Sequence, residues 1–139
     1  MSDVVERPFG DYAFQQYLGQ EKLMGCRCVN CDTLFVPPRS ICRLCHKLNM
    51  QWQQMKGTGK LVTYTHITIG PPALAAQGYD RDHPYCCGVV ELDEKVRVAA
   101  RIEAGEVLGS IGFGMAVRVV FLHPADRANG RTVLAFRAI

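Results

Sequence analysis

The hydrophobic positions of the chain change their spacing between its first residues and its second half. Near the start they recur at helical spacing, because Phe9, Ala13 and Tyr17 lie four residues apart in the segment from Pro8 to Leu18. This pattern predicts a short amphipathic helix that ends at Gly19. A helix of this length is marginal on its own in water, so it must pack against the rest of the protein.

From Gly57 onward the apolar positions alternate with polar ones, which is the period of a half-buried strand. The cleanest example places Val98 and Ile102 on one face and Arg97 and Arg101 on the other. Five strands are predicted, over residues 61–69, 85–92, 96–102, 115–122 and 132–138, with a tight hairpin at 92–96 and a glycine-rich connector at 105–114. No intervening segment is long enough for a helical crossover, so the pattern predicts a small antiparallel barrel.

Length and composition limit the class of protein. The chain has 139 residues, of which 48% are hydrophobic and 21% are charged, and this composition excludes a solvated disordered tail. No apolar run approaches the roughly 18–20 residues of a membrane-spanning helix. The first residues carry two acidic side chains and no apolar core, unlike a secretory signal. These features favour a cytoplasmic protein with no membrane partner, and its cysteines are expected to be thiols or metal ligands.

Five of the seven cysteines lie between Cys26 and Cys45. Four of them form two CxxC pairs that are separated by ten residues: Cys28, Cys31, Cys42 and Cys45. Two residues between thiols allow both sulfurs of a turn to face one point, and two such turns make a tetrahedral four-sulfur cage. The pattern predicts one structural Zn²⁺ with no open coordination position, and a rubredoxin-like iron is the alternative.

Two neighbouring residues compete for these ligand positions. Cys26 is an alternative to Cys28, and His46 is a weaker alternative beside Cys45. The two-residue spacing favours Cys28, which leaves Cys26 as a strand residue that leads into the first turn. Positive charge gathers in the same region, since residues 21–60 carry seven basic and two acidic side chains. Its basic residues either compensate the charge of the thiolates or contact a phosphate.

The order of these features resembles a known family. The CxxC pairs enclose Pro37-Pro38-Arg39, and they are followed by Trp52, by a Gly-x-Gly strand opening at 57–65, by Pro84-Tyr85 and by Val-Val-Glu-Leu-Asp at 89–93. Over about residues 8–138 the chain is similar to the prokaryotic acyl-CoA-associated proteins that combine a zinc ribbon with an OB-fold. It departs from them at Arg43-Leu44 and His46, where proline and glycine are frequent, and in its long loop from Gly70 to Pro84.

The resemblance implies a mainly β fold with an N-terminal helix (residues 1–20), a rubredoxin-like zinc ribbon (21–56) and a C-terminal five-stranded OB-like barrel (57–139). It also implies a non-catalytic accessory subunit in a hetero-oligomer with a thiolase-fold enzyme, as in thiolase complexes with such small subunits. A CoA thioester is then the ligand of the complex. If its phosphates contact this chain, the expected residues are Arg39, Arg43 and Lys47. The acyl group, the reaction direction and the stoichiometry are not predicted.

Other candidate sites carry weaker signals. Cys86-Cys87 has only His83 nearby as a base, so packing is the favoured interpretation. The Asp80-Arg81-Asp82-His83 cluster is typical of a solvated loop tip, and His66 and His123 are expected to be structural. The 70–84 loop suits a partner interface or a lid over an acyl chain, or is a plain mobile loop.

Two other functions are alternatives to the accessory subunit. A single-stranded nucleic-acid-binding protein can also combine a zinc ribbon with an OB-fold, but the region beyond residue 60 has eight basic and eight acidic side chains and so no net positive charge, which argues against it. Independent catalysis lacks a convincing nucleophile–base pair. We therefore expect no catalytic residue and no nucleic-acid partner.

Overall fold

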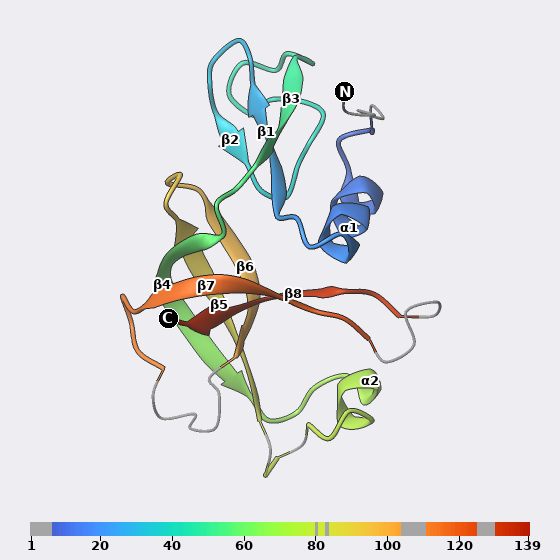
Figure 1. Ribbon diagram of the computed structural model, residues 1–139, viewed down its shortest axis with the longest axis vertical. Helices are drawn as coiled ribbons and strands as arrows, with labels where there is room; N and C mark the ends of the chain where they lie inside the picture. The colour runs from blue at the N-terminus through green and yellow to red at the C-terminus, as the bar shows by residue number, and fades with distance from the viewer. Residues whose placement is uncertain (1–6, 80, 83, 104–110, 125–129) are drawn as a thin grey trace. The chain divides into compact units, whose positions relative to one another are not determined.

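The computed structural model describes residues 7–79, 81–82, 84–103, 111–124 and 130–139 (Figure 1). The chain divides into two compact units. One contains the described residues up to Lys56 together with those between His123 and Thr132, and the other contains those of Gly57–Leu122 and Val133–Ile139. No helix in these described ranges is long and apolar enough to cross a membrane.

A three-stranded antiparallel sheet forms the base of the first unit. Its order is β2-β1-β3, with β1 at Met24–Cys28, β2 at Leu34–Phe35 and β3 at Met50–Gln54. The buried residues of its core are Cys26, Cys28, Phe35, Cys42 and Met50. Three of these five side chains are cysteines, so the core has little aliphatic surface of its own, and a metal crosslink is the kind of support that such small folds need.

The predicted N-terminal helix is confirmed as α1, Asp11–Gly19, and it ends at the expected glycine. It begins after Gly10, because Pro8 and Phe9 leave the helical path and the Phe9 ring packs 4.8 Å from the ring of Trp52 on β3. Tyr17 contacts the same indole at 5.0 Å, and the indole Nε1 donates to the Arg7 carbonyl at 3.0 Å. Trp52 therefore attaches the helix to the ribbon sheet.

The described residues 123–124 and 130–132, which lie in sequence between two barrel strands, belong to the first unit. The Gln15 side-chain amide donates to the Thr132 carbonyl at 2.6 Å, and His123 Nε2 lies 3.0 Å from a carboxylate oxygen of Glu21. The sequence pattern gave no sign of this excursion, because long-range hydrogen bonds carry no local periodicity.

The second unit is a closed five-stranded barrel, as predicted. Its strands are β4 (Thr58–Ile67), β5 (Tyr85–Leu92), β6 (Arg97–Glu103), β7 (Ala116–Leu122) and β8 (Val133–Ala138), in the order β4-β5-β6-β8-β7. One pairing differs from the antiparallel expectation, since β8 lies parallel to β6. Alternation identifies a strand but not the direction of its neighbour, and inserting β8 between β6 and β7 is what closes this barrel.

Strand β4 begins three residues earlier than its apolar pattern indicates. Gly59 lies so close to β5 that a Cβ there would be 2.3 Å from the Glu91 carbonyl oxygen, so a side chain at this position would separate the strands. A bulge between Leu61 and Thr63 then shifts the register. The expected hairpin at 92–96 forms, with the Leu92 amide donating to the Val96 carbonyl at 2.9 Å.

The 70–84 loop contains a short helix, α2 (Pro72–Ala75), that the sequence interpretation missed. The available signal was Pro72 followed by alanines and a leucine, because proline is favoured in the first helical turn. Tyr79 of this loop packs 5.6 Å from Tyr85, and the Arg101 guanidinium lies 5.3 Å from its ring centre. Most of the glycine-rich connector expected at 105–114 lies outside the described residues.

Candidate metal centre

The two CxxC turns are built by the same hydrogen bonds. In the first, the Cys28 amide donates to the Thr33 carbonyl at 2.9 Å and the Asp32 amide donates to the Cys28 carbonyl at 2.7 Å. In the second, the Cys42 amide donates to the Lys47 carbonyl at 3.1 Å and the His46 amide donates to the Cys42 carbonyl at 2.9 Å. Repetition of one local geometry places both pairs of thiols in matching turns.

The four predicted ligand sulfurs lie together, all within 4.8 Å of one another. Cys28 Sγ is 3.5 Å from Cys45 Sγ, and Cys31 Sγ is 3.4 Å from Cys42 Sγ. A tetrahedral ion with Zn–S bonds of about 2.3 Å needs sulfurs about 3.8 Å apart, so the cluster has the size of a four-sulfur metal cage. The four cysteines are therefore positioned to bind a metal ion.

Backbone amides around the turns act on the charge of the thiols. The Cys45 amide, burial and the Leu44 amide act on Cys42 in that order of size, and the net effect lowers its pKa to about 6. At Cys28 the Cys31 amide lowers the pKa, but burial and the neighbouring thiols of Cys45 and Cys31 outweigh it and raise the pKa to about 11. Without a metal, Cys42 therefore loses its proton at a lower pH than Cys28 does.

The two competing ligand candidates lie outside this cluster. Cys26 is fully buried on β1, where its sulfur accepts from the Arg39 amide at 3.3 Å and lies 3.4 Å from the Arg39 carbonyl. Burial raises the pKa of the Cys26 thiol. Its side chain therefore fastens the segment after Pro38 to the sheet, a function that the spacing alone did not reveal.

The three candidate phosphate-binding cations lie in the same unit, but two of them have local partners. The Arg39 guanidinium donates through Nε to the Ile41 carbonyl at 3.0 Å and lies over the Phe35 ring. Lys47 Nζ donates to Asn30 Oδ1 at 3.4 Å and so links the two turns. Arg43 is exposed and has no ion-pair partner among the described residues.

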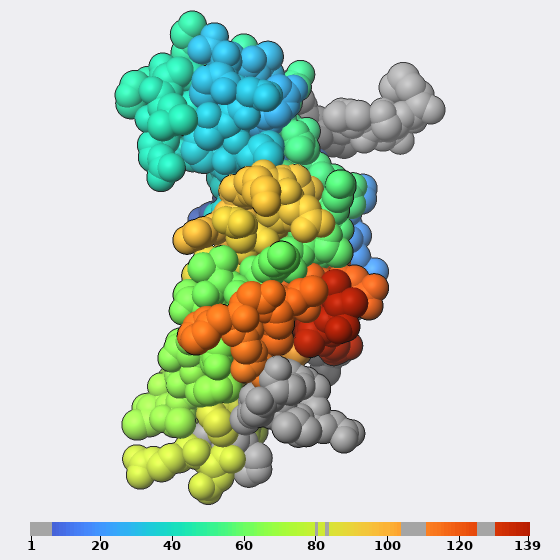
Figure 2. Space-filling view, turned by 90° about the vertical axis from the view of Figure 1, so that its left-hand side faces the viewer, coloured from blue at the N-terminus to red at the C-terminus, as the bar shows by residue number. Residues whose placement is uncertain are grey.

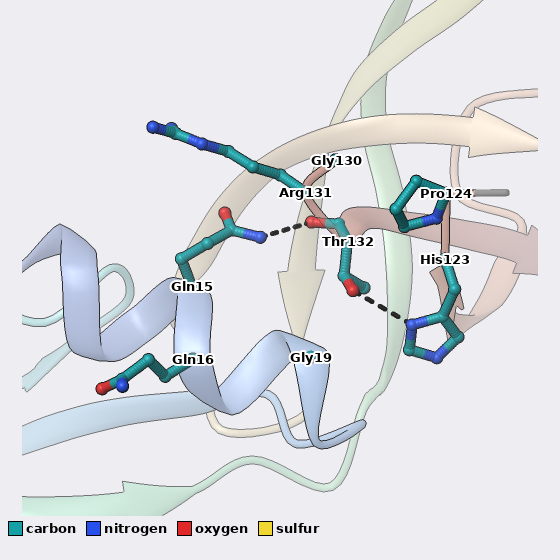
Figure 3. A pocket seen from close by; sticks show the side chains of 8 residues that line it. All are labelled: Gln15, Gln16, Gly19, His123, Pro124, Gly130, Arg131 and Thr132. Atoms are coloured by element: carbon teal, nitrogen blue, oxygen red, sulfur yellow. Dashed lines mark hydrogen bonds between the residues drawn. The ribbon is translucent and has the colours of Figure 1, made fainter. Parts of the chain in front are cut away.

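Apart from the metal centre, the same unit has a concave region with a volume of about 250 Å³ (Figure 3). His123 Nδ1 faces the Thr132 hydroxyl at 3.0 Å, and the Gln15 amide points at the Thr132 carbonyl. The other ring nitrogen of His123, Nε2, lies within hydrogen-bond distance of Glu21 Oε1, at 3.0 Å. These contacts agree with the structural assignment of His123, because each of its ring nitrogens has a protein partner.

The remaining reactive side chains show no activation among the described residues. Cys86 is buried, and burial raises its pKa; burial also raises the pKa of Cys87, although Arg101 opposes it. The His66 ring packs edge-on against Tyr64. Asp80 and His83 of the loop-tip cluster lie outside the described residues.

Comparison with protein families matches both parts of the chain. The family described as the ChsH2 rubredoxin-like zinc ribbon domain matches residues 16–51, and the ChsH2 C-terminal OB-fold domain matches residues 52–122. A DUF35 domain-containing scaffold protein of Methanocaldococcus jannaschii is 31% identical over 100 residues, which cover 71% of this chain and 67% of the relative. One of Pyrococcus furiosus is 35% identical over 99 residues, which cover 71% and 68%.

Two solved structures share the fold. A chain of the Ltp2-ChsH2(DUF35) aldolase has a TM-score of 0.75 and 27% identity, and the match covers 99% of this chain and 98% of that one. A DUF35-family protein of unknown function from Sulfolobus solfataricus has a TM-score of 0.60 and 18% identity, with 92% and 84% covered, which shows the fold alone.

Proposed function

This chain belongs to the family that joins a ChsH2-type zinc ribbon to a ChsH2-type OB-fold domain, and from that premise we propose that it is a zinc-binding accessory subunit of an enzyme complex that makes or breaks carbon–carbon bonds in acyl-CoA substrates. The observation that carries the proposal is the match over nearly the whole chain to a subunit of the Ltp2-ChsH2 aldolase. Its relatives described as scaffold proteins support the same assignment.

The metal in this proposal is one structural Zn²⁺ held by Cys28, Cys31, Cys42 and Cys45. The distances between their sulfurs support this assignment. When bound, zinc supplies a crosslink between the two turns, and four thiolates leave no position for a water or substrate. Residues of the chain support the site in two ways. Backbone amides of the two turns favour the thiolate form of the ligands, and Cys26 and Phe35 pack beneath the site.

Chemistry is assigned to the partner subunit. The described thiols outside the ribbon have raised pKa values, which disfavours them as nucleophiles. The neighbouring structure is named an aldolase, and a thiolase acts on the same type of bond, so we propose a thiolase-fold catalytic subunit as the partner. A CoA thioester is the proposed ligand of the complex. Contacts of its phosphates with Arg39, Arg43 and Lys47 stay a prediction.

Purification of the chain at native expression level from its own host tests the assembly. We expect a stoichiometric complex with an acyl-CoA carbon–carbon bond enzyme, identified by mass spectrometry and rebuilt from the two purified components. The rebuilt complex should be more active or more stable than the catalytic subunit alone. Recovery of a lone monomer that binds single-stranded oligonucleotides would overturn the proposal.

A further inference from the structure

Large apolar side chains are exposed around the metal centre. Their exposed fractions are 42% for Val29, 47% for Ile41, 64% for Leu44 and 74% for Leu48. Val29 and Leu44 lie inside the two CxxC turns, and Ile41 and Leu48 flank the second turn. Single exposed apolar residues are normal, but several on one rigid feature mark an interaction site. We call these four residues the knuckle surface.

Backbone hydrogen bonds bring the segments that carry these residues close together. The bond from the Cys42 amide to the Lys47 carbonyl closes the second turn, which includes Leu44, and Ile41 and Leu48 are the residues just outside this bond. The Val29 amide donates to the Asn49 carbonyl at 2.9 Å, which places Val29 next to the residue after Leu48. Figure 2 shows the teal segment, which contains the second turn, at one side of this unit.

The charged side chains on and near the second turn are all basic. Between Thr33 and Lys56 the sequence contains no aspartate or glutamate, and the basic residues Arg39, Arg43 and Lys47 are all exposed. On the first turn, Asp32 is already paired with Arg27 at 2.6 Å. A surface that complements this one therefore has an apolar centre and a rim of carboxylates.

We propose that the knuckle surface is the docking site for an apolar patch, rimmed by carboxylates, on the catalytic subunit. This inference rests on the proposed function and adds to it the surface that holds the complex together. The hydrogen-bonded turns fix the backbone of Val29 and Leu44 before binding, so little conformational entropy is lost when the partner covers them. Leu44 and Leu48, the two most exposed, form the centre of the contact.

A double variant, Leu44→Asp with Leu48→Asp, tests the site in the reconstituted complex. Both side chains are exposed, so the variant should keep one metal per chain and the wild-type circular dichroism. We expect the dissociation constant of the complex to rise at least about 100-fold, because two central apolar contacts are replaced by charges that repel an acidic rim. The matched control replaces Ile69 and Ile139, which are 76% and 71% exposed in the other unit, by aspartate. The control should change the dissociation constant by less than about threefold.

The outcomes separate the inference from the proposed function. If the wild-type chain forms no complex with an acyl-CoA enzyme, the proposed function fails. If the wild-type chain forms the complex and the Leu44/Leu48 variant binds equally well, the docking site is wrongly assigned and the proposed function stands. Loss of self-association of the isolated chain in that variant, without loss of the hetero-complex, would assign the surface to a second copy and also overturn the inference.

Ionic strength tests the carboxylate rim. We expect the association rate constant of the wild-type complex to fall at least tenfold between about 0.05 and about 0.5 M salt, because charge steering is screened. An association rate constant that is independent of salt would contradict an acidic rim.

Discussion

Asp32 and His46 occupy the same position in the two cysteine turns, and both have left-handed backbone, with φ of 66° and 61°. Each follows the second cysteine of its pair and donates its amide to the carbonyl of the first. Aspartate and histidine tolerate this conformation better than most residues, but both carry the Cβ that glycine lacks. Histidine stands at position 46, where glycine is frequent in the family. It leaves the turn intact but adds backbone strain.

His46→Gly should stabilise the protein. We expect the free energy of unfolding to rise by about 0.5–1 kcal/mol, since glycine enters the left-handed region without a Cβ clash. Denaturant unfolding of the metal-loaded protein measures this change. Asp32→Gly is the control and should gain less, because it also removes the contact with Arg27. A destabilised His46→Gly protein would show that the imidazole itself supports the turn.

The ligand assignment is tested by two serine variants that differ by two positions. Cys28→Ser should lose most of its zinc and unfold the ribbon, because oxygen replaces one sulfur of the cage. Cys26→Ser should keep one zinc per chain and lose only part of its stability, since its sulfur bonds to the Arg39 backbone and is not one of the four clustered sulfurs. The zinc content of both purified proteins tests the assignment. Loss of zinc from Cys26→Ser but not from Cys28→Ser would make Cys26 the ligand.

Zinc retention should depend on pH in one direction. The pKa of Cys42 is lowered to about 6, so the folded chain favours its thiolate. The stability that this thiolate contributes is fully present above the ordinary thiol pKa and is lost as pH falls through about 6. Protons also compete with metal at Cys28, whose pKa without metal is raised to about 11. We expect zinc release to a chromogenic chelator to accelerate between pH 7 and 5, and release that is fastest at alkaline pH would contradict this sign.

Arg43→Ala tests the predicted CoA contact in the assembled complex. Loss of one charge-assisted contact to a phosphate should raise the KM for acyl-CoA roughly fivefold and leave kcat unchanged. Lys60→Ala, an exposed cation on β4, is the matched control and should leave KM unchanged. Complex formation must be verified for both variants, and a KM that Arg43→Ala does not alter would remove this residue from the CoA site.

Trp52→Ala should release the N-terminal helix. The indole contacts Phe9 and Tyr17 and bonds to the Arg7 carbonyl, so its loss should cost roughly 2–4 kcal/mol of unfolding free energy. Trp52→Phe keeps the ring packing and should cost less. Thermal unfolding of the metal-loaded variants compares the two. Equal losses would place the main contribution in the Nε1 hydrogen bond.

Local patterns predicted much of this fold because their causes are local. Two CxxC pairs specify four sulfurs within reach of one point, and the structure brings those four together. Period-two alternation predicted the strands of the barrel, and helical spacing predicted the helix that ends at Gly19. The four-residue helix α2 was missed because its signal is a single proline before a few helix-forming residues.

By itself the sequence determined which segments form the barrel strands, where the helix stops and which cysteines share a spacing, because each depends on neighbours within a few residues. Only the tertiary structure decided that β8 lies parallel to β6, that Thr132 bonds to Gln15 and that the Cys26 sulfur contacts Arg39. These relationships join residues far apart along the chain. Their free energy comes from closing the barrel and satisfying buried polar groups, which no local pattern records.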